Sequence, residues 1–362
     1  MHAGRSPLRE QIEREIRDCG PIPFSRYMEV CLYDPVAGYY SRSAEQFGQA
    51  GDFYTSSDVH AVFGRLLCRR FDAMWRSLGS PASIEVLELG PGRGLFARDL
   101  LAWAGRKFPE FFSALRYTLQ ESSPALRQRL RVNLADFLSG GKAAVPEPQP
   151  FPVPPAETAR IVFANEFFDA LPVEILSPMG KLHLAFENDR LCEAWLPPSQ
   201  AELDFLERYS VRPEAGERLE VALPAQAWMK AIASSFSAGF LVVIDYGYAR
   251  SQQIAGHHRG TLMAYRRHSA TSDPYQAPGE QDLTAHVNFT ALADAAAVLG
   301  MEVEKLQTQS QFLLGIGEEN QFADAFEECR LPQERAKVAL QLKHLISPAG
   351  MGETFQVLTA RR

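Results

Sequence analysis

The chain has few cysteines and no long apolar run, and each absence excludes a class of protein. Five cysteines in 362 residues, without any C-x-x-C spacing, predict neither a disulfide framework nor a zinc ribbon. We therefore expect reducing surroundings and a cytoplasmic location. The opening MHAGRSPLREQIEREI lacks the apolar core of a signal peptide, and no segment is long and apolar enough to span a bilayer. No membrane insertion is expected.

Excess positive charge is also missing. A net charge of -7 argues against a broad nucleic-acid surface, so no nucleic-acid partner is predicted. Adjacent His257 and His258 would point in different directions in regular structure and lack a third ligand at a diagnostic spacing, so no metal site is predicted. A hydrophobic content of 46% is ample for a packed core.

Strand-like and helix-like stretches alternate after residue 80. The strand candidates IEVLELG, RYTLQE, RIVFANEF and FLVVIDYG are separated by helical patterns, which predicts an α/β fold whose parallel sheet is covered on both faces. Residues 1–80 are predicted to be a helical N-terminal extension that contributes to a cofactor cleft. Residues 81–362 are predicted to form the main domain, with insertions near 175–230, which begins with a hairpin, and near 250–286.

A glycine-rich loop, IEVLELGPGRGLFARDLL, follows the first strand. No Gly-Lys-Ser/Thr follows, so it is not a phosphate loop of the nucleotide triphosphatases, and its G-x-G-x-G spacing fits a dinucleotide site imperfectly. An acid, an apolar residue and then Gly90, Gly92 and Gly94 resemble the first motif of S-adenosylmethionine-dependent methyltransferases instead. NAD remains the nearest rival ligand.

Polar residues end all four predicted strands, at the edge of the sheet where α/β proteins bind ligands. S-adenosylmethionine has a zwitterionic end and a ribose but no pyrophosphate, so bare backbone and carboxylates suit it. Glu88 is a candidate for its amino end and Glu121 for its ribose hydroxyls. The other strand-end candidates are Asn165, Glu166, Asp245 and Tyr246.

Seven further segments resemble one family in order along the chain. They are GDFYTSSDVHAVFG, ELGPGRG, ANEFFDALPVE, VIDYG, GTLMAYRRH, PGEQDLTAHVNF and MGETFQVL. Together they are similar to the protein arginine methyltransferases typified by the mitochondrial complex I assembly factor, which has many bacterial relatives. The resemblance spans nearly the whole chain.

This resemblance implies a Rossmann-like, seven-stranded methyltransferase sheet, S-adenosyl-L-methionine as methyl donor and an arginine of a protein as acceptor, with a respiratory-complex subunit as one candidate. It also implies cofactor contacts for Asp52, Thr55 and Ser56, besides the glycine loop, Glu88, Glu121 and Asn165. Ser57 and Asn288 depart from the family pattern, which often has proline and usually has aspartate at these places.

The catalytic candidates are Glu166, Asp245 and Tyr246, because carboxylates can grip a guanidinium and a phenol can orient it. Asp169 is a further acid whose alternative role is to cap a helix, and the alternative role of Asp245 is to hold a turn. The aromatic segment around Tyr40 either covers the cofactor or packs in the core, and His286 either shapes the acceptor pocket or makes a structural hydrogen bond. Two other functions stay open: a noncatalytic assembly factor with the same fold, and a dinucleotide-dependent oxidoreductase.

Overall fold

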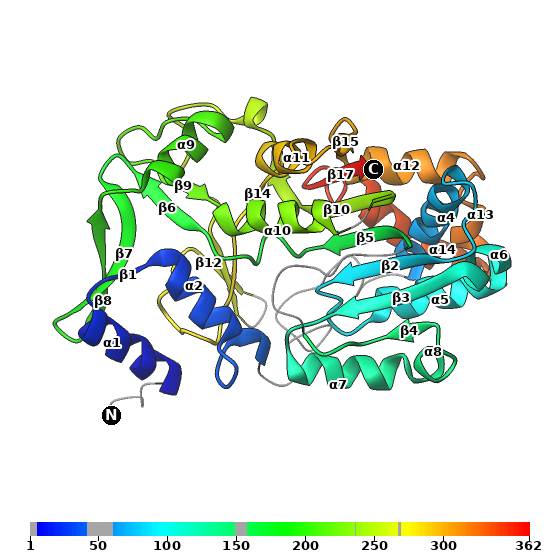
Figure 1. Ribbon diagram of the computed structural model, residues 1–362, viewed down its shortest axis with the longest axis horizontal. Helices are drawn as coiled ribbons and strands as arrows, with labels where there is room; N and C mark the ends of the chain where they lie inside the picture. Colours follow the sequence, from blue (N-terminus) through cyan, green and yellow to red (C-terminus); the bar gives the residue numbers. More distant parts are fainter. Residues whose placement is uncertain (1–5, 42–60, 149–157, 236, 267–268) are drawn as a thin grey trace.

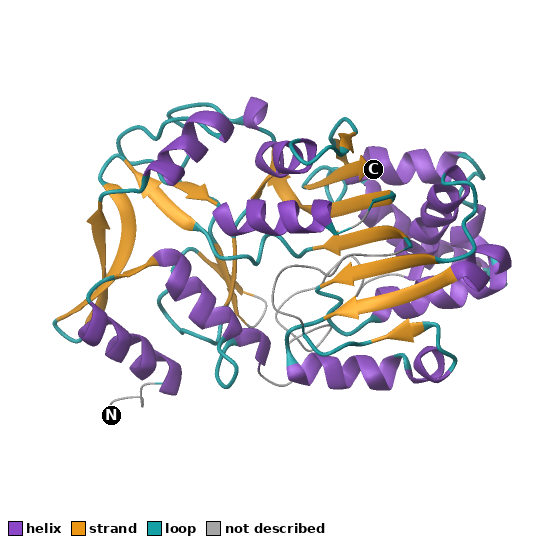
Figure 2. Cartoon of the chain, viewed as in Figure 1, coloured by secondary structure: helices purple, strands orange, loops and turns teal. Residues whose placement is uncertain are grey.

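A nine-stranded mixed sheet forms the centre of the computed structural model, which describes residues 6–41, 61–148, 158–235, 237–266 and 269–362 (Figures 1 and 2). The sheet order is β15-β17-β10-β5-β2-β3-β4, with β14 beside β10 and β16 beside β17. Its strands are β2 (Ile84–Leu89), β3 (Leu115–Gln120), β4 (Ala143–Ala144), β5 (Ala159–Asn165), β10 (Gly239–Tyr248), β14 (Val287–Asn288), β15 (Glu302–Val303), β16 (Gln307–Thr308) and β17 (Phe355–Arg361).

The four strands predicted from the sequence are β2, β3, β5 and β10, and they pair in parallel. The predicted α/β class is therefore confirmed. The seven-strand count is not confirmed, because the sheet also includes two-residue strands, namely β4, β14, β15 and β16. Such short pairings carry no periodic signal in a sequence.

Alternating side chains of the strands enter two different cores, which gives three layers. In β2, Ile84 and Val86 join the core under one set of helices, whereas Leu87 and Leu89 join the core on the opposite face. The first set comprises α4 (Ala61–Ser77), α5 (Leu95–Lys107), α6 (Pro109–Ala114), α7 (Pro124–Asn133), α12 (Gln309–Glu318), α13 (Ala323–Phe326) and α14 (Pro332–Ile346). The second set comprises α10 (Leu223–Ser234) and α11 (Phe289–Ala297). A short helix, α8 (Ala135–Ser139), follows α7 in the chain.

A second part of the molecule lies beside the sheet, on the left in Figure 1. It contains a five-stranded sheet, a three-stranded sheet and the first helices of the chain. Its elements are α1 (Pro7–Cys19), β1 (Ile22–Pro23), α2 (Phe24–Tyr33), η1 (Tyr39–Ser41), β6 (Glu174–Ser177), β7 (Gly180–Glu187), β8 (Arg190–Leu196), α9 (Gln200–Tyr209), β9 (Leu219–Val221), η3 (Arg250–Gln252), β11 (Met263–Arg266), β12 (Ser269–Thr271) and β13 (Asp282–Thr284).

The second part has its own core, drawn from three distant stretches of sequence. Leu8 and Ile12 of α1 pack in one cluster with Leu184 of the β7–β8 hairpin and Leu283 of β13. Strand β1 also pairs with β7, so the start of the chain is built into the sheet of the first insertion. The second core therefore closes only when all three stretches are present.

The hairpin predicted after residue 180 is confirmed, with β7 and β8 pairing antiparallel across the turn residues Asn188 and Asp189. Both turn residues have positive φ, 47° and 67°, as a two-residue type I′ turn requires. Asparagine and aspartate tolerate this conformation better than other non-glycine residues. The local sequence therefore fixes the register of the hairpin.

The arrows of β2, β3 and β5 in Figure 1 point toward the second part, so their carboxyl ends meet it. Ligands of parallel α/β sheets bind at this edge. No helix of the described residues is both long enough and apolar enough to cross a membrane.

Candidate active site

The glycine loop connects β2 to α5, and all three glycines have left-handed backbone conformations. Their φ values are 62° at Gly90, 54° at Gly92 and 73° at Gly94. Side-chain-bearing residues rarely adopt these angles, which explains why glycine occupies all three places. Among the described residues, a Cβ atom at Gly92 would meet nothing within 4 Å, whereas one at Gly94 would lie 2.5 Å from Leu130 of α7. Gly92 thus faces open space, and Gly94 serves close packing.

A cavity of about 690 Å³ lies at the carboxyl ends of β2, β3, β5 and β10. This volume is within the range of small-molecule sites, roughly 300–1,000 Å³. Seven of the predicted residues line it: Glu88, Gly90, Gly92, Glu121, Asn165, Glu166 and Tyr246. Gly94 and Asp245 are predicted site residues outside this lining. Asp52, Thr55 and Ser56, together with Ser57, lie outside the described residues.

Two buried glutamates lie on the side of the cavity next to the glycine loop. Glu88 is 4% exposed and accepts a hydrogen bond of 2.8 Å from the hydroxyl of Tyr117. Glu121 is 7% exposed and accepts one of 2.8 Å from the backbone amide of Ser123. Burial raises the pKa of Glu88 to about 8 and that of Glu121 to about 7. A cationic or hydrogen-bond-donating ligand would therefore stabilise the ionised form of both carboxyl groups.

Asn165 ends β5, the strand that pairs with β2, and Glu166 follows it at the cavity. The amide of Asn165 donates to Oε1 of Glu166 at 3.0 Å, while its own Oδ1 is buried without a hydrogen-bond partner in the described structure. Glu166 has φ 51°, an uncommon conformation for a residue with a side chain. Strained backbone of this kind is concentrated at functional sites.

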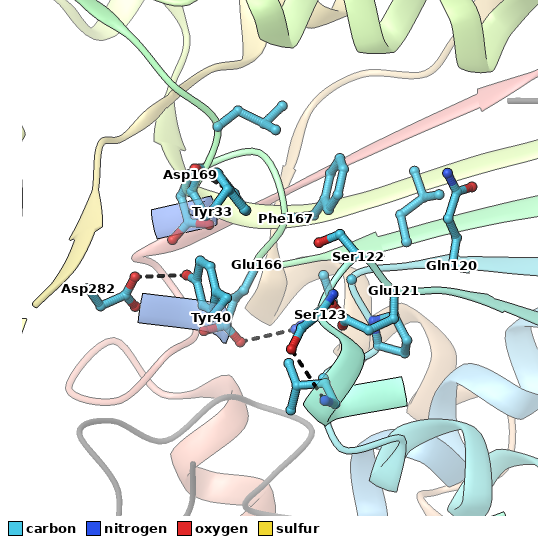
Figure 3. Close-up of a pocket in the computed structure, with 18 of the residues that line it drawn as sticks. Tyr33, Tyr40, Gln120, Glu121, Ser122, Ser123, Glu166, Phe167, Asp169 and Asp282 are labelled. Atoms are coloured by element: carbon cyan, nitrogen blue, oxygen red, sulfur yellow. Dashed lines mark hydrogen bonds between the residues drawn. The ribbon is translucent and has the colours of Figure 1, made fainter. Parts of the chain in front are cut away.

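Aromatic side chains from three regions close the cavity around these acids. Tyr246 of β10 packs on Phe355, with ring centroids 3.9 Å apart, and stacks at 6.4 Å on His286. Tyr40, whose hydroxyl donates to Asp282 at 2.8 Å, also lines the cavity (Figure 3). Of the roles considered for the aromatic segment, Tyr40 thus faces the cavity, whereas Tyr39 is buried in the second core.

The lining residues that sequence reasoning missed include Tyr33, Tyr265 and Asp282. Tyr33 ends α2, Tyr265 belongs to β11 and Asp282 begins β13, so all three come from the second part of the molecule. The only available signal was the position of Tyr265 and Asp282 inside the segments GTLMAYRRH and PGEQDLTAHVNF. Strand-end reasoning does not reach them, because it considers the central sheet alone.

Asp245 does not face the cavity as predicted. It is fully buried, and its Oδ2 accepts backbone amides of Phe167 at 3.2 Å, Phe168 at 2.9 Å and Asp169 at 3.3 Å. Its Oδ1 accepts the amide of Tyr246 at 2.9 Å. The carboxylate therefore holds the loop after β5 from behind, which matches the turn-holding alternative.

Asn288, one of the two departures from the family pattern, is buried at the start of α11. Its Oδ1 accepts the amide of Ala291 at 3.1 Å, the helix cap that an aspartate would also form. Its amide donates to the carbonyl oxygen of Tyr209 at 2.8 Å, a bond that an ionised aspartate lacks the proton to make. This departure is thus accommodated at the start of α11 rather than in the cavity.

The residues present fit S-adenosylmethionine. Gly92 leaves open space where a ligand can approach the backbone, and the buried Oδ1 atoms of Asn165 and Asp169 lack partners in the described structure. Buried polar atoms are rarely left unpaired in native proteins, so these atoms indicate a polar ligand. Glu88 and Glu121, the acceptors predicted for the amino group and ribose of such a ligand, line the same cavity.

Residues 66–307 match the family described as S-adenosyl-L-methionine-dependent methyltransferase. The fold, the cavity and this match define a methyltransferase that uses S-adenosyl-L-methionine. A Drosophila melanogaster relative, named protein arginine methyltransferase NDUFAF7 homolog, mitochondrial, is 30% identical over 98% of this chain and 85% of its own length. The Danio rerio NDUFAF7 protein is 29% identical over 93% of this chain and 82% of its own length. The chain belongs to this methyltransferase family.

A solved structure supports the same assignment. The crystal structure of a Burkholderia thailandensis protein bound to S-adenosyl-homocysteine has a TM-score of 0.84 and 28% identity, and the alignment covers 98% of this chain and 92% of that one. The predicted cofactor is thereby confirmed.

The expected cytoplasmic location is wrong by these comparisons. The relatives from fly, zebrafish and human are all named mitochondrial. The expectation rested on an odd number of cysteines without a framework spacing, and such a pattern indicates only reducing surroundings. It cannot distinguish one reducing compartment from another.

The affinity for S-adenosylhomocysteine is expected to rise between pH 6 and pH 8. The raised pKa values of Glu121, about 7, and Glu88, about 8, mean that the free protein holds protons that cofactor binding to the ionised forms must release. For each proton released on binding, the affinity rises by up to about tenfold per pH unit. Calorimetry in two buffers of different ionisation enthalpy measures the release; a flat affinity profile contradicts the assignment.

The same shifts predict how the ligand-free protein responds to pH. Both carboxyl groups have folded pKa values above the ordinary 4.5, so the folded state binds more protons than the unfolded state between pH 5 and 8. Their contribution to stability is present below pH about 4.5 and is lost as pH rises through about 7 to 8. The increase in Tm on adding S-adenosylhomocysteine should therefore grow from pH 6 to pH 8.

Glu121→Ala is expected to weaken binding of S-adenosylhomocysteine by about 1 to 3 kcal/mol, the range for losing a charged hydrogen-bond partner. Titration calorimetry of the variant measures the loss, and its Tm without ligand shows whether the turn at Ser123 survives. Glu110→Ala, on the exposed surface of α6, is the control and should bind normally. An unchanged isotherm for Glu121→Ala removes this residue from the cofactor site.

Proposed function

We propose that this methyltransferase transfers the methyl group to an arginine side chain of a protein. The observation that carries the proposal is the pairing of two carboxylates, Glu166 and Asp169, in the same cavity as the glycine loop. A guanidinium is charged in nearly all protein settings and matches carboxylates in geometry and charge. The names of the Drosophila and zebrafish relatives, protein arginine methyltransferase, support the same acceptor.

The aromatic lining favours a flat cation over a compact one. Tyr33, Tyr40, Tyr246 and Tyr265 line the cavity together with the two acids. Guanidinium groups stack on aromatic faces and are more weakly hydrated than ammonium groups, so they lose less on entering such a site. We infer that this part of the cavity, contributed largely by the N-terminal extension and the insertion near 250–286, receives the acceptor.

Alignment is the principal contribution that this chain makes to the reaction. S-adenosylmethionine, when bound, supplies an electrophilic methyl group on a sulfonium. We assign the binding of that ligand to Gly90, Gly92, Glu88 and Glu121. Glu166 binds the acceptor, and Tyr246 limits where the acceptor can lie. The enzyme needs no nucleophile of its own for a direct in-line transfer, because holding two reactants in the correct geometry supplies much of the rate enhancement.

Labelled-methyl transfer into a host lysate, followed by mass spectrometry, tests the proposal. Methylated arginine in one protein is the expected result, and a subunit of a respiratory complex is the first acceptor to test. Glu166→Gln should reduce transfer while leaving affinity for S-adenosylhomocysteine unchanged. Label on another residue type overturns the arginine assignment. Cofactor binding without any transfer favours a noncatalytic assembly factor.

A further inference from the structure

One carboxylate oxygen of the cavity is buried and has no partner. Asp169 is 6% exposed and lines the cavity, and its Oδ1 has no hydrogen bond in the described structure. The described residues also form no ion pair with it. A buried carboxylate oxygen without a donor is costly, so its retention indicates a donor that arrives with a ligand.

Helix capping, the alternative role for Asp169, does not occur. The chain runs from β5, which ends at Asn165, to β6, which begins at Glu174, and no helix lies between these fully described strands. The side chain has no helix amides to satisfy. Figure 3 shows the side chain of Asp169 beside Tyr33 on the cavity wall. Helix capping does not explain this position, so the side chain is available for another role.

The backbone of Asp169 is held from two directions. Its amide donates to Oδ2 of Asp245 at 3.3 Å, and its carbonyl oxygen accepts the amide of Ala285 at 3.0 Å. The central sheet and the insertion near 250–286 thus fix its position together. A group that must act on a reacting atom benefits from such fixed placement.

Asp169 and Glu166 differ in environment although they are three residues apart. Glu166 is half-buried and accepts the Asn165 amide, whereas Asp169 is enclosed. Burial, with the charge of Glu166, raises the pKa of Asp169 to about 7. Burial is the main cause that raises the pKa of Tyr33, Tyr40, Tyr246 and Tyr265, and the charge of Asp169 adds to the rise in each, which places Asp169 near these rings. Two neighbouring carboxyl groups in different environments commonly divide substrate binding and proton transfer between them.

We propose that Asp169 is the catalytic base, which receives the proton of the attacking acceptor nitrogen, while the carboxylate of Glu166 binds the acceptor. This inference rests on the proposed function. The guanidinium nitrogen gives its proton to Oδ1 of Asp169 and its electron pair to the methyl carbon. The carbon–sulfur bond breaks and its electron pair stays on sulfur, which leaves S-adenosylhomocysteine, a methylated guanidinium and one proton on Asp169.

Kinetics of Asp169→Asn test the role on the acceptor that the labelling experiment identifies. The variant keeps the size of the side chain but cannot take up the proton, so we expect kcat to fall by about 100-fold to 10,000-fold, while loss of the carboxylate charge raises KM for the acceptor about tenfold. Glu166→Gln should mainly raise KM. The wild-type rate should fall on the acid side of its pH profile, and Asp169→Asn should lose that limb. A kcat within threefold of wild type with the limb retained overturns the proposal.

A binding measurement keeps the test independent of turnover. With S-adenosylhomocysteine saturating, methylguanidinium is titrated by calorimetry into wild type, Asp169→Asn and a matched control, Glu220→Gln. Glu220 is also buried and accepts the backbone amide of Thr261, but it lies outside this cavity. We expect at least tenfold weaker binding in Asp169→Asn alone.

Equal isotherms for wild type and Asp169→Asn, including no binding in either, overturn the inference. Preference of the wild type for methylammonium over methylguanidinium contradicts the arginine acceptor instead. If Asp169→Asn then loses methylammonium binding, the assignment of Asp169 stands. The two failures are thereby distinguished.

Discussion

Gly92→Val is expected to abolish binding of S-adenosylhomocysteine while leaving a folded protein. The Cβ atom of the variant points into open space at the cavity, so the added branches occupy volume that the cofactor needs rather than volume filled by protein. The positive φ of 54° adds a destabilisation of about 1 to 2 kcal/mol. Titration calorimetry measures the first effect and thermal unfolding the second.

Gly79→Val is the matched control for this variant. Gly79 has φ 84°, nothing within 4 Å of its added Cβ, and a position after α4 that does not line the cavity. It therefore shares the backbone cost without the steric conflict and should bind the cofactor normally. Gly94→Val should instead lose stability, because its Cβ collides with Leu130. Normal affinity in Gly92→Val contradicts the placement of the cofactor against this loop.

Asp245→Ala is expected to lower the free energy of unfolding by about 3 kcal/mol. Each buried amide left without an acceptor costs about 1 to 3 kcal/mol, and relaxation of the loop after β5 recovers part of the total. Phe167, Phe168 and Asp169 all donate to this carboxylate. Methyl transfer should fall with stability, since the same amides position Asp169.

Urea unfolding at pH 7 measures the change, and Asp204→Ala on the exposed surface of α9 serves as control with an effect within about 0.5 kcal/mol. Asp245→Asn, which keeps an acceptor oxygen, should retain more of the stability than the alanine variant. A normal unfolding curve for Asp245→Ala combined with lost transfer supports a direct contact with the acceptor, as the sequence alone had suggested.

The sequence was sufficient to predict the central sheet, because β5 and β10 contain apolar runs that end in polar residues, while β2 and β3 are strand-like segments with polar residues between the apolar ones. It was sufficient to predict the cavity-facing Glu88 and Glu121 for the same reason. It did not distinguish Glu166 from Asp245, since both end a strand. The two residues differ because the carboxylate of Asp245 accepts backbone amides of the loop at residues 167–169. This loop is 76 to 78 residues away in the sequence, so the contact could not be predicted from the strand itself.

The cavity residues of the second part could not be predicted from the ends of strands, for a different reason. Tyr33 and Asp282 are separated by most of the chain, and they meet through a core that no single stretch encodes. Asp169 was recognised as an acid of interest, but its alternative as a helix cap could be rejected only once the absence of a helix after β5 was known. Local patterns predict elements, whereas the contacts between distant elements decide which side chains share a site.

The composite second core has a consequence for how the protein folds during synthesis. Leu8 and Ile12 are synthesised more than 250 residues before their partner Leu283. Closing a loop of this length is entropically slow, and the apolar face of α1 stays exposed until it closes. The central sheet has a separate core, but β17 joins it only at the end of the chain. Nascent chains therefore pass through a long, aggregation-prone interval, and the acceptor wall of the cavity is among the last surfaces to form.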